Sequence, residues 1–255
     1  MVRARAKERL IFALDVGTLA EADELVDLLE GSVGMFKVGK QLFLRTGPTI
    51  IERIRERGSE VFLDLKFHDI PQTVARAAME ATRLGVAIFN VHASGSAEMM
   101  KQTVHAVDRV CRTEKLRRPR ILAVTVLTSI SSVDLKTIGV VSQVQDQVVR
   151  LARLAESCGM DGVVASPQEL GPIRRACARK FIVLTPGVRP AGCDSDDQKR
   201  VAGPADAVGR GADYVVVGRP IRDAPDPRAA ARAIVNEIAS ALPPLACVGV
   251  LPQSS

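Results

Sequence analysis

The stretch VFLDLKFHDIPQTV, residues 61–74, decides how the rest of the chain is interpreted. It begins like an ordinary buried strand, yet Asp64, Lys66 and Asp69 follow within a few positions. Side chains two residues apart on a strand point to the same face. We therefore expect Asp64 and Lys66 on one face of this strand, and the alternate apolar residues on the other.

Seven further segments are rich in β-branched and other apolar residues. Between most of them lie stretches with apolar residues at a spacing of three to four, several of which end in Gly, as helices do. Nearly continuous hydrophobic strands that alternate with amphipathic helices are typical of a parallel sheet covered by helices. Eight such units predict an α/β fold, a single-domain (β/α)8 TIM barrel. The predicted strands are residues 10–15, 34–40, 60–67, 87–94, 120–129, 162–167, 181–187 and 214–221.

An open doubly wound sheet is the main alternative fold. It would use fewer strands, and the chain has neither G-x-G-x-x-G after its first strand nor G-x-x-x-x-G-K-[ST] anywhere. The barrel is therefore favoured. We expect it to span residues 1–242, and we expect residues 243–255, which begin with two prolines, to form a loosely ordered tail.

Composition excludes several classes of protein. The chain has 255 residues, 47% hydrophobic and 25% charged, with no Trp, as in a globular protein with an aliphatic core. Its net charge is +6, but the basic residues are mixed with acids and lack interleaved aromatics, so no nucleic-acid partner is expected. Five cysteines form no C-x-x-C pair, and the three histidines lie outside metal-ligand spacing from them. Without a membrane-length apolar run or a signal h-region, the sequence predicts a cytoplasmic protein without a membrane partner.

In a barrel of this kind the active site lies at the carboxyl ends of the strands. Lys37 on the neighbouring strand and Asp69 just beyond the strand could both reach Asp64 and Lys66. These four residues could then form an alternating Lys–Asp–Lys–Asp array. A structural ion network is the alternative, but burying four charges at one barrel mouth is costly and is usually kept for function. Other polar residues in or at the ends of predicted strands are Asp15, Asn90, His92, Thr128 and Arg219, which follows Gly218.

A second group of polar residues follows the seventh and eighth strands. The segment TPGVRP (185–190) contains Arg189, DDQKRV (196–201) contains Gln198, and VVVGRPI (215–221) contains Gly218 and Arg219. Barrels often bind phosphate at this place through backbone N–H groups and a guanidinium. A phosphate site is therefore predicted. For His92, a structural hydrogen bond and a substrate contact both remain open.

The segment DLKFHDIPQTV resembles the bacterial type of the orotidine 5'-phosphate decarboxylase family, whose signature D-x-K-x-x-D-I-P-x-T-V it matches in full. The segments FALDV, FKVGKQLF, NVHASG, LTPGVRP and VVVGRPI resemble that family in the same order, whereas the tail does not. The resemblance implies a carboxy-lyase of de novo pyrimidine synthesis that converts orotidine 5'-monophosphate to uridine 5'-monophosphate and carbon dioxide. It also implies no cofactor, no metal and a homodimer with shared active sites.

The resemblance also implies a role for each site residue. Lys66 would be the general acid that protonates C6 of the pyrimidine, and Asp64 would face the substrate carboxylate. Asp15 and Lys37 would hold the ribose hydroxyls, while Asp69 and Thr73 would reach across the interface to the ribose in the partner's site. Thr128, with Ser129 or Ser131, would lie beside the base, and a loop that closes over the phosphate would carry the residues of the phosphate side, which are Arg189, Gln198, Gly218 and Arg219.

Two other functions remain open. A magnesium-dependent sugar-phosphate decarboxylase of the same superfamily resembles this chain in D-x-K-x-x-D, although the I-P-x-T-V continuation argues against it. A catalytically silent nucleotide-binding protein would require a lesion in the charged array, and Lys37, Asp64, Lys66 and Asp69 are all present.

Overall fold

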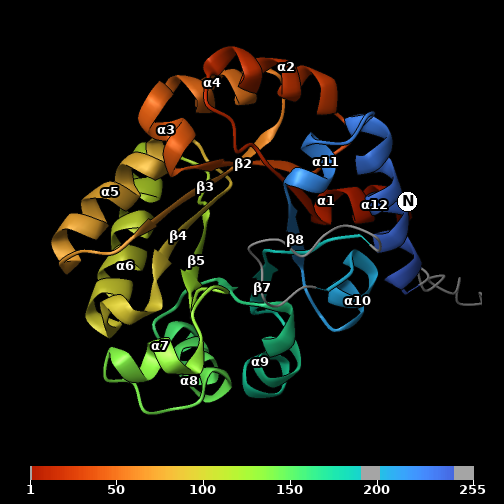
Figure 1. The fold of residues 1–255 in the computed structure, drawn as a ribbon. Helices are drawn as coiled ribbons and strands as arrows, with labels where there is room; N and C mark the ends of the chain where they lie inside the picture. Colours follow the sequence, from red (N-terminus) through yellow and green to blue (C-terminus); the bar gives the residue numbers. More distant parts are fainter. Residues whose placement is uncertain (1, 191–201, 244–255) are drawn as a thin grey trace, which may run out of the picture.

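The computed structural model describes residues 2–190 and 202–243. Eight parallel strands close into a barrel in the order β1 to β8, and the helices lie around it (Figure 1). The predicted (β/α)8 barrel is confirmed. The strands are β1 (Leu10–Ala13), β2 (Met35–Gly39), β3 (Glu60–Phe67), β4 (Ile88–His92), β5 (Arg120–Val124), β6 (Gly162–Val164), β7 (Ile182–Thr185) and β8 (Tyr214–Val217).

Each strand lies within a predicted segment, but most are shorter than predicted at their carboxyl ends. Thr128, predicted to end the fifth strand, lies beyond β5 in a turn where the Ile130 N–H donates to the Leu127 carbonyl (3.0 Å). The apolar residues of such loops face the barrel mouth and therefore continue the hydrophobic pattern of the strand. A prediction from hydrophobicity alone then makes the strand too long.

Helices follow the strands, and one precedes them. The first helix, α1 (Val2–Arg9), was not predicted; it enters β1 directly and packs beside α12 (Figure 1). The others are α2 (Leu19–Leu29), α3 (Lys40–Thr46), α4 (Thr49–Glu56), α5 (Pro71–Arg83), α6 (Ala97–Glu114), α7 (Ser132–Thr137), α8 (Val144–Ser157), α9 (Leu170–Ala176), α10 (Pro204–Gly209), α11 (Arg219–Arg222) and α12 (Pro227–Ala241), with short 3-10 turns at Ala93–Gly95 and Pro167–Glu169.

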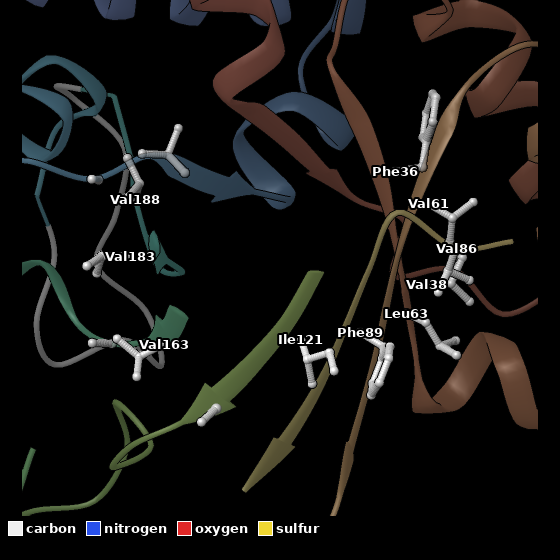
Figure 2. Packing of buried hydrophobic residues seen from close by; sticks show 14 of the residues in the cluster. Phe36, Val38, Val61, Leu63, Val86, Phe89, Ile121, Val163, Val183 and Val188 are labelled. Carbon is white, nitrogen blue, oxygen red and sulfur yellow. The ribbon is translucent and has the colours of Figure 1, made fainter. Parts of the chain in front are cut away.

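The core has two layers, one on each side of the barrel wall. Alternate residues of the strands, such as Phe62, fill the inside. The residues between them, such as Val61 and Leu63, pack outward against the helices, and Figure 2 shows both in that layer together with Phe36 and Val38 of β2. The same alternation turns polar residues at the strand ends inward, toward the barrel mouth.

Strand β3 is irregular where its charges begin. Leu63 pairs with Phe89 and Phe67 pairs with Val91, so three residues of β3 lie opposite the single residue Asn90 of β4. Within this bulge Lys66 has a φ of 54°, in the left-handed region. Side-chain alternation predicted the shared face of Asp64 and Lys66, but it could not predict this backbone turn.

None of the helices in the described ranges is long and apolar enough to cross a membrane. The last helix, α12, ends at Ala241, next to the predicted barrel boundary. The predicted tail from residue 244 onward lies outside the described residues, so its character stays a prediction.

Candidate active site

The carboxylate of Asp64 lies between two ammonium groups at the mouth of the barrel. The Nζ of Lys66 is 2.6 Å from its Oδ1, and the Nζ of Lys37 is 3.6 Å from its Oδ2. Lys37 also contacts Oδ1 of Asp15 at 2.9 Å. The side chains of Lys37 and Asp64 are only 10% and 12% exposed. Three of the four predicted array members are therefore together, with Asp15 as the next carboxylate in the chain of charges.

Neighbouring strands bring these groups together. Lys37 pairs in register with Ala13 of β1, and Gly39 pairs with Asp64 of β3. A Cβ on Gly39 would lie 3.2 Å from the Nζ of Lys37 and 3.3 Å from Oδ1 of Asp15. The missing side chain at this position therefore leaves room for the ion pair.

The charge of Asp64 is set by opposing effects. Burial alone would raise the pKa of this carboxyl group. The ammonium groups of Lys37 and Lys66, with hydrogen bonds from Lys66 and Asn90, outweigh burial and hold the pKa of Asp64 below its ordinary value. Asp64 is therefore ionised at neutral pH, and its negative charge stabilises both ammonium groups.

Two adjoining pockets share Lys37 and Asp64. The first, of about 190 Å³, has mainly apolar walls, including Phe62, and is also lined by Lys66 and Thr128. The second, of about 360 Å³, is polar and basic, and the residues that line it include Asp15, Gly187, Arg189, Gly218, Arg219 and Arg222. The two pockets suit a molecule with a flat ring at one end, an anion at the other and polar groups between.

The loops after β7 and β8 shape the basic pocket. Gly187 has a φ of 72°, a conformation that favours glycine, and the Arg189 N–H donates to the Ala202 carbonyl (3.0 Å). Gly218 lies so close to β1 that a Cβ there would be 3.2 Å from that of Ala13. The predicted phosphate residues Arg189, Gly218 and Arg219 thus share one pocket, whereas Gln198 lies outside the described residues.

Sequence reasoning missed Arg222 in the same pocket. Its Nη1 donates to the backbone carbonyl of Asp15 (2.7 Å) and its Nε to Asp223 (2.6 Å), so it ties α11 to the loop after β1. Arg222 lies about one helical turn after Arg219, and this spacing is the sequence signal that could have predicted its place in the pocket.

Asp69 and Thr73 lie away from the array of their own chain. Both are exposed, and Oδ1 of Asp69 accepts a hydrogen bond from the Ile70 N–H (2.6 Å). Among the described residues Asp69 makes no ion pair with Lys37 or Lys66, so the four-membered array is not formed within one chain. Ile70, between them, is an apolar side chain that is 66% exposed. Ser131 is occupied as the N-cap of α7, where its hydroxyl bonds Asp134.

The histidines form a pair at the ends of β3 and β4. The rings of His68 and His92 are 5.2 Å apart between centroids. Burial, followed by electrostatic interactions with His68 and Lys66, lowers the pKa of His92 to about 4. His92 is therefore neutral at physiological pH. The proximity of the two rings was not predicted, because it depends on how the bulge in β3 places His68 beside the end of β4.

A closed barrel with buried charges and a basic pocket at its carboxyl end is typical of enzymes that act on small phosphorylated substrates. A family model described as "Orotidine 5'-phosphate decarboxylase / HUMPS family" matches residues 8–234. The chain belongs to this family.

Curated relatives and solved structures agree with that assignment. Proteins named orotidine 5'-phosphate decarboxylase from Geotalea daltonii and Syntrophotalea carbinolica are 52% and 54% identical, over 93% of this chain and 99% and 97% of theirs. The crystal structure of orotidine 5'-phosphate decarboxylase from Lactobacillus acidophilus has a TM-score of 0.80 at 35% identity, covering 90% of this chain and 98% of that one.

Proposed function

We propose that the chain is an orotidine 5'-phosphate decarboxylase, a carboxy-lyase that forms uridine 5'-monophosphate and carbon dioxide in pyrimidine synthesis. The observation that carries this function is Asp64 held between Lys37 and Lys66, at the point where an apolar and a basic pocket meet. A cytoplasmic location belongs to the proposal, and the free thiols of Cys111, Cys158 and Cys177 suit a reducing compartment.

The apolar and basic pockets favour one orientation of the substrate. The pyrimidine ring occupies the apolar pocket beside Thr128 and Lys66. The phosphate occupies the basic pocket with Arg189, Gly218 and Arg219, and Gln198 is proposed to join them. The ribose then lies beside the contacting pair Asp15 and Lys37, both of which line the basic pocket.

The chemical problem is a carbanion that the ring cannot delocalise well. The bond between C6 and the carboxylate carbon breaks, carbon dioxide leaves and the electron pair remains on C6. The ammonium of Lys66 stabilises this charge and then gives its proton to C6. Lys66 is left neutral and recovers a proton from water, so the reaction needs no electron acceptor.

Asp64 could act in two ways. Repulsion between its carboxylate and that of the substrate would fade as carbon dioxide forms, and two unit charges about 4 Å apart interact by roughly 4 kcal/mol at an effective dielectric of about 20. Its contacts with Lys66 and Lys37 favour the other account, because two cations already compensate its charge. We propose that Asp64 mainly orients Lys66 and keeps it protonated.

The phosphate lies away from the reacting carbon, yet it contributes to the rate. Interactions with a remote group can provide the free energy that closes a loop and orients the charged array. Arg189 on the loop after β7 and Arg219 at the start of α11 line the basic pocket and can use that binding energy.

We also propose a homodimer in which each subunit completes the site of the other. The surface around Ile70 supports this arrangement, because an exposed apolar side chain lies between two exposed polar residues that have no role in their own site. Asp69 and Thr73 then reach the ribose bound by the partner subunit.

The direct test uses purified protein, orotidine 5'-phosphate and excess chelator. The absorbance of the substrate should fall as uridine 5'-monophosphate forms, at the same rate with and without chelator. Absence of turnover would overturn the proposal. Turnover of a sugar phosphate that depends on added magnesium would support the alternative function within the same family.

A further inference from the structure

Asn90 of β4 is fully buried and both ends of its carboxamide are used. Its Oδ1 accepts the backbone N–H of Lys66 (2.8 Å), and its Nδ2 donates to Oδ1 of Asp64 (2.7 Å). These bonds fix the orientation of the amide, since an N–H requires an acceptor and a carboxylate requires a donor. A single side chain therefore contacts both the backbone of Lys66 and the carboxylate that binds its ammonium.

The bulge in β3 explains why a side chain is needed there. Three residues of β3 lie opposite Asn90 alone, so the ladder offers too few backbone partners for all of them. Lys66, in the middle of this segment, has left-handed backbone geometry, which a residue with a long side chain adopts only where its surroundings enforce it. The Asn90 oxygen replaces the missing carbonyl partner of the Lys66 N–H.

We propose that Asn90 is a positioning residue for decarboxylation, which sets the backbone of Lys66 and the carboxylate of Asp64 in one fixed relation. It lines neither pocket, so it acts through these two residues and not on the substrate. Leu122, its register partner on β5, is apolar, and the charged groups at this part of the mouth are Lys37, Asp64 and Lys66.

The kinetic effect of this inference rests on the proposed function, whereas its structural effect does not. Asn90→Leu has a similar volume and removes both hydrogen bonds. Its kcat on orotidine 5'-phosphate should fall by about 100-fold, because misplacing the proton donor affects only the transition state. The dissociation constant of uridine 5'-monophosphate should stay within about threefold of wild type, because Asn90 touches neither pocket.

Two further variants separate positioning from stability. Asn90→Asp keeps the acceptor for Lys66, and because two buried carboxyl groups so close together cannot both ionise, it binds a proton that it can donate to Asp64. Its kcat should therefore fall much less than that of Asn90→Leu. Thr103→Val on α6, a helix outside the barrel, removes a hydroxyl that is equally buried and that donates to the Met99 carbonyl (2.8 Å); Thr103 lines neither pocket. It should lower the unfolding temperature and leave kcat unchanged.

Crystal structures of the wild type and of Asn90→Leu complete the test. In Asn90→Leu, we expect Lys66 to leave its left-handed conformation and its Nζ to move away from Asp64. An Asn90→Leu protein that keeps both features, or that folds with a kcat within about twofold of wild type, would overturn the proposal. If the wild type itself lacks decarboxylase activity, the proposed function fails, and the two structures still decide whether Asn90 positions Lys66.

Discussion

Lys37 contacts two carboxylates at once, and Gly39 leaves the space for that contact. Gly39 has extended backbone geometry, with φ −90° and ψ 178°, which alanine adopts without strain. Gly39→Ala should therefore fold normally, but its Cβ would push the Nζ of Lys37 away from Asp15. We expect KM for orotidine 5'-phosphate to rise by about tenfold, measured by steady-state kinetics.

A matched control for this prediction is Gly209→Ala in α10. A Cβ at Gly209 would meet no atom within 4 Å, so KM should not change. An unchanged KM in Gly39→Ala would show that Lys37 and Asp15 do not hold the substrate through this arrangement.

The residues of the array show what a sequence can predict. Charged residues in an apolar strand are costly, so Asp64, Lys66 and Lys37 could be assigned to one site before their geometry was known. Asn90 was noticed as a polar residue in a strand, but its two hydrogen bonds depend on the bulge in β3. A bulge here has no signal in the hydrophobic pattern, because apolar and charged residues still alternate through it.

At the ends of β3 and β4, the rings of His68 and His92 lie against each other in a tilted arrangement. The pKa of His92 is about 4 in the folded chain and near 6.5 in the unfolded chain. Between these values the unfolded chain binds more protons, so the free energy of unfolding falls as pH falls from about 7 to about 5. Since His92 is partly exposed, we expect a contribution of the order of 1 kcal/mol.

Urea unfolding at the two pH values tests this expectation at fixed protein concentration. His92→Gln should lose part of the pH dependence, whereas His105→Gln, at an exposed position of α6, should retain all of it. Equal pH dependence in the wild type and in His92→Gln would contradict the lowered pKa of His92.

At the scale of the whole molecule, eight alternating segments were sufficient to predict the closed barrel. The strand ends were less predictable, because residues in the mouth loops are buried like those in strands. The sequence could not place Asp69 and Thr73 by geometry either, since their proposed role requires a second chain.

Mixed dimers test that role. Lys66→Ala and Asp69→Asn each remove one component of a site, and a heterodimer of the two has one intact site if Asp69 serves the partner. Co-expression in equal amounts should restore about one quarter of wild-type activity, because half of the dimers are mixed and each has one intact site of two. Lys66→Ala mixed with Asp64→Asn should restore none. If the mixture of Lys66→Ala and Asp69→Asn restores no activity, the proposed shared site is contradicted.

In the proposed mechanism Lys66 delivers the proton to C6, and the Lys66→Ala variant probes this step. Measured on orotidine 5'-phosphate beside the wild type, its kcat should fall by at least about 1000-fold, because both the proton donor and the nearest positive charge are lost. Binding of uridine 5'-monophosphate through Arg189 and Arg219 should persist and show that the site is still folded. A kcat within about tenfold of the wild type would contradict the proposed mechanism.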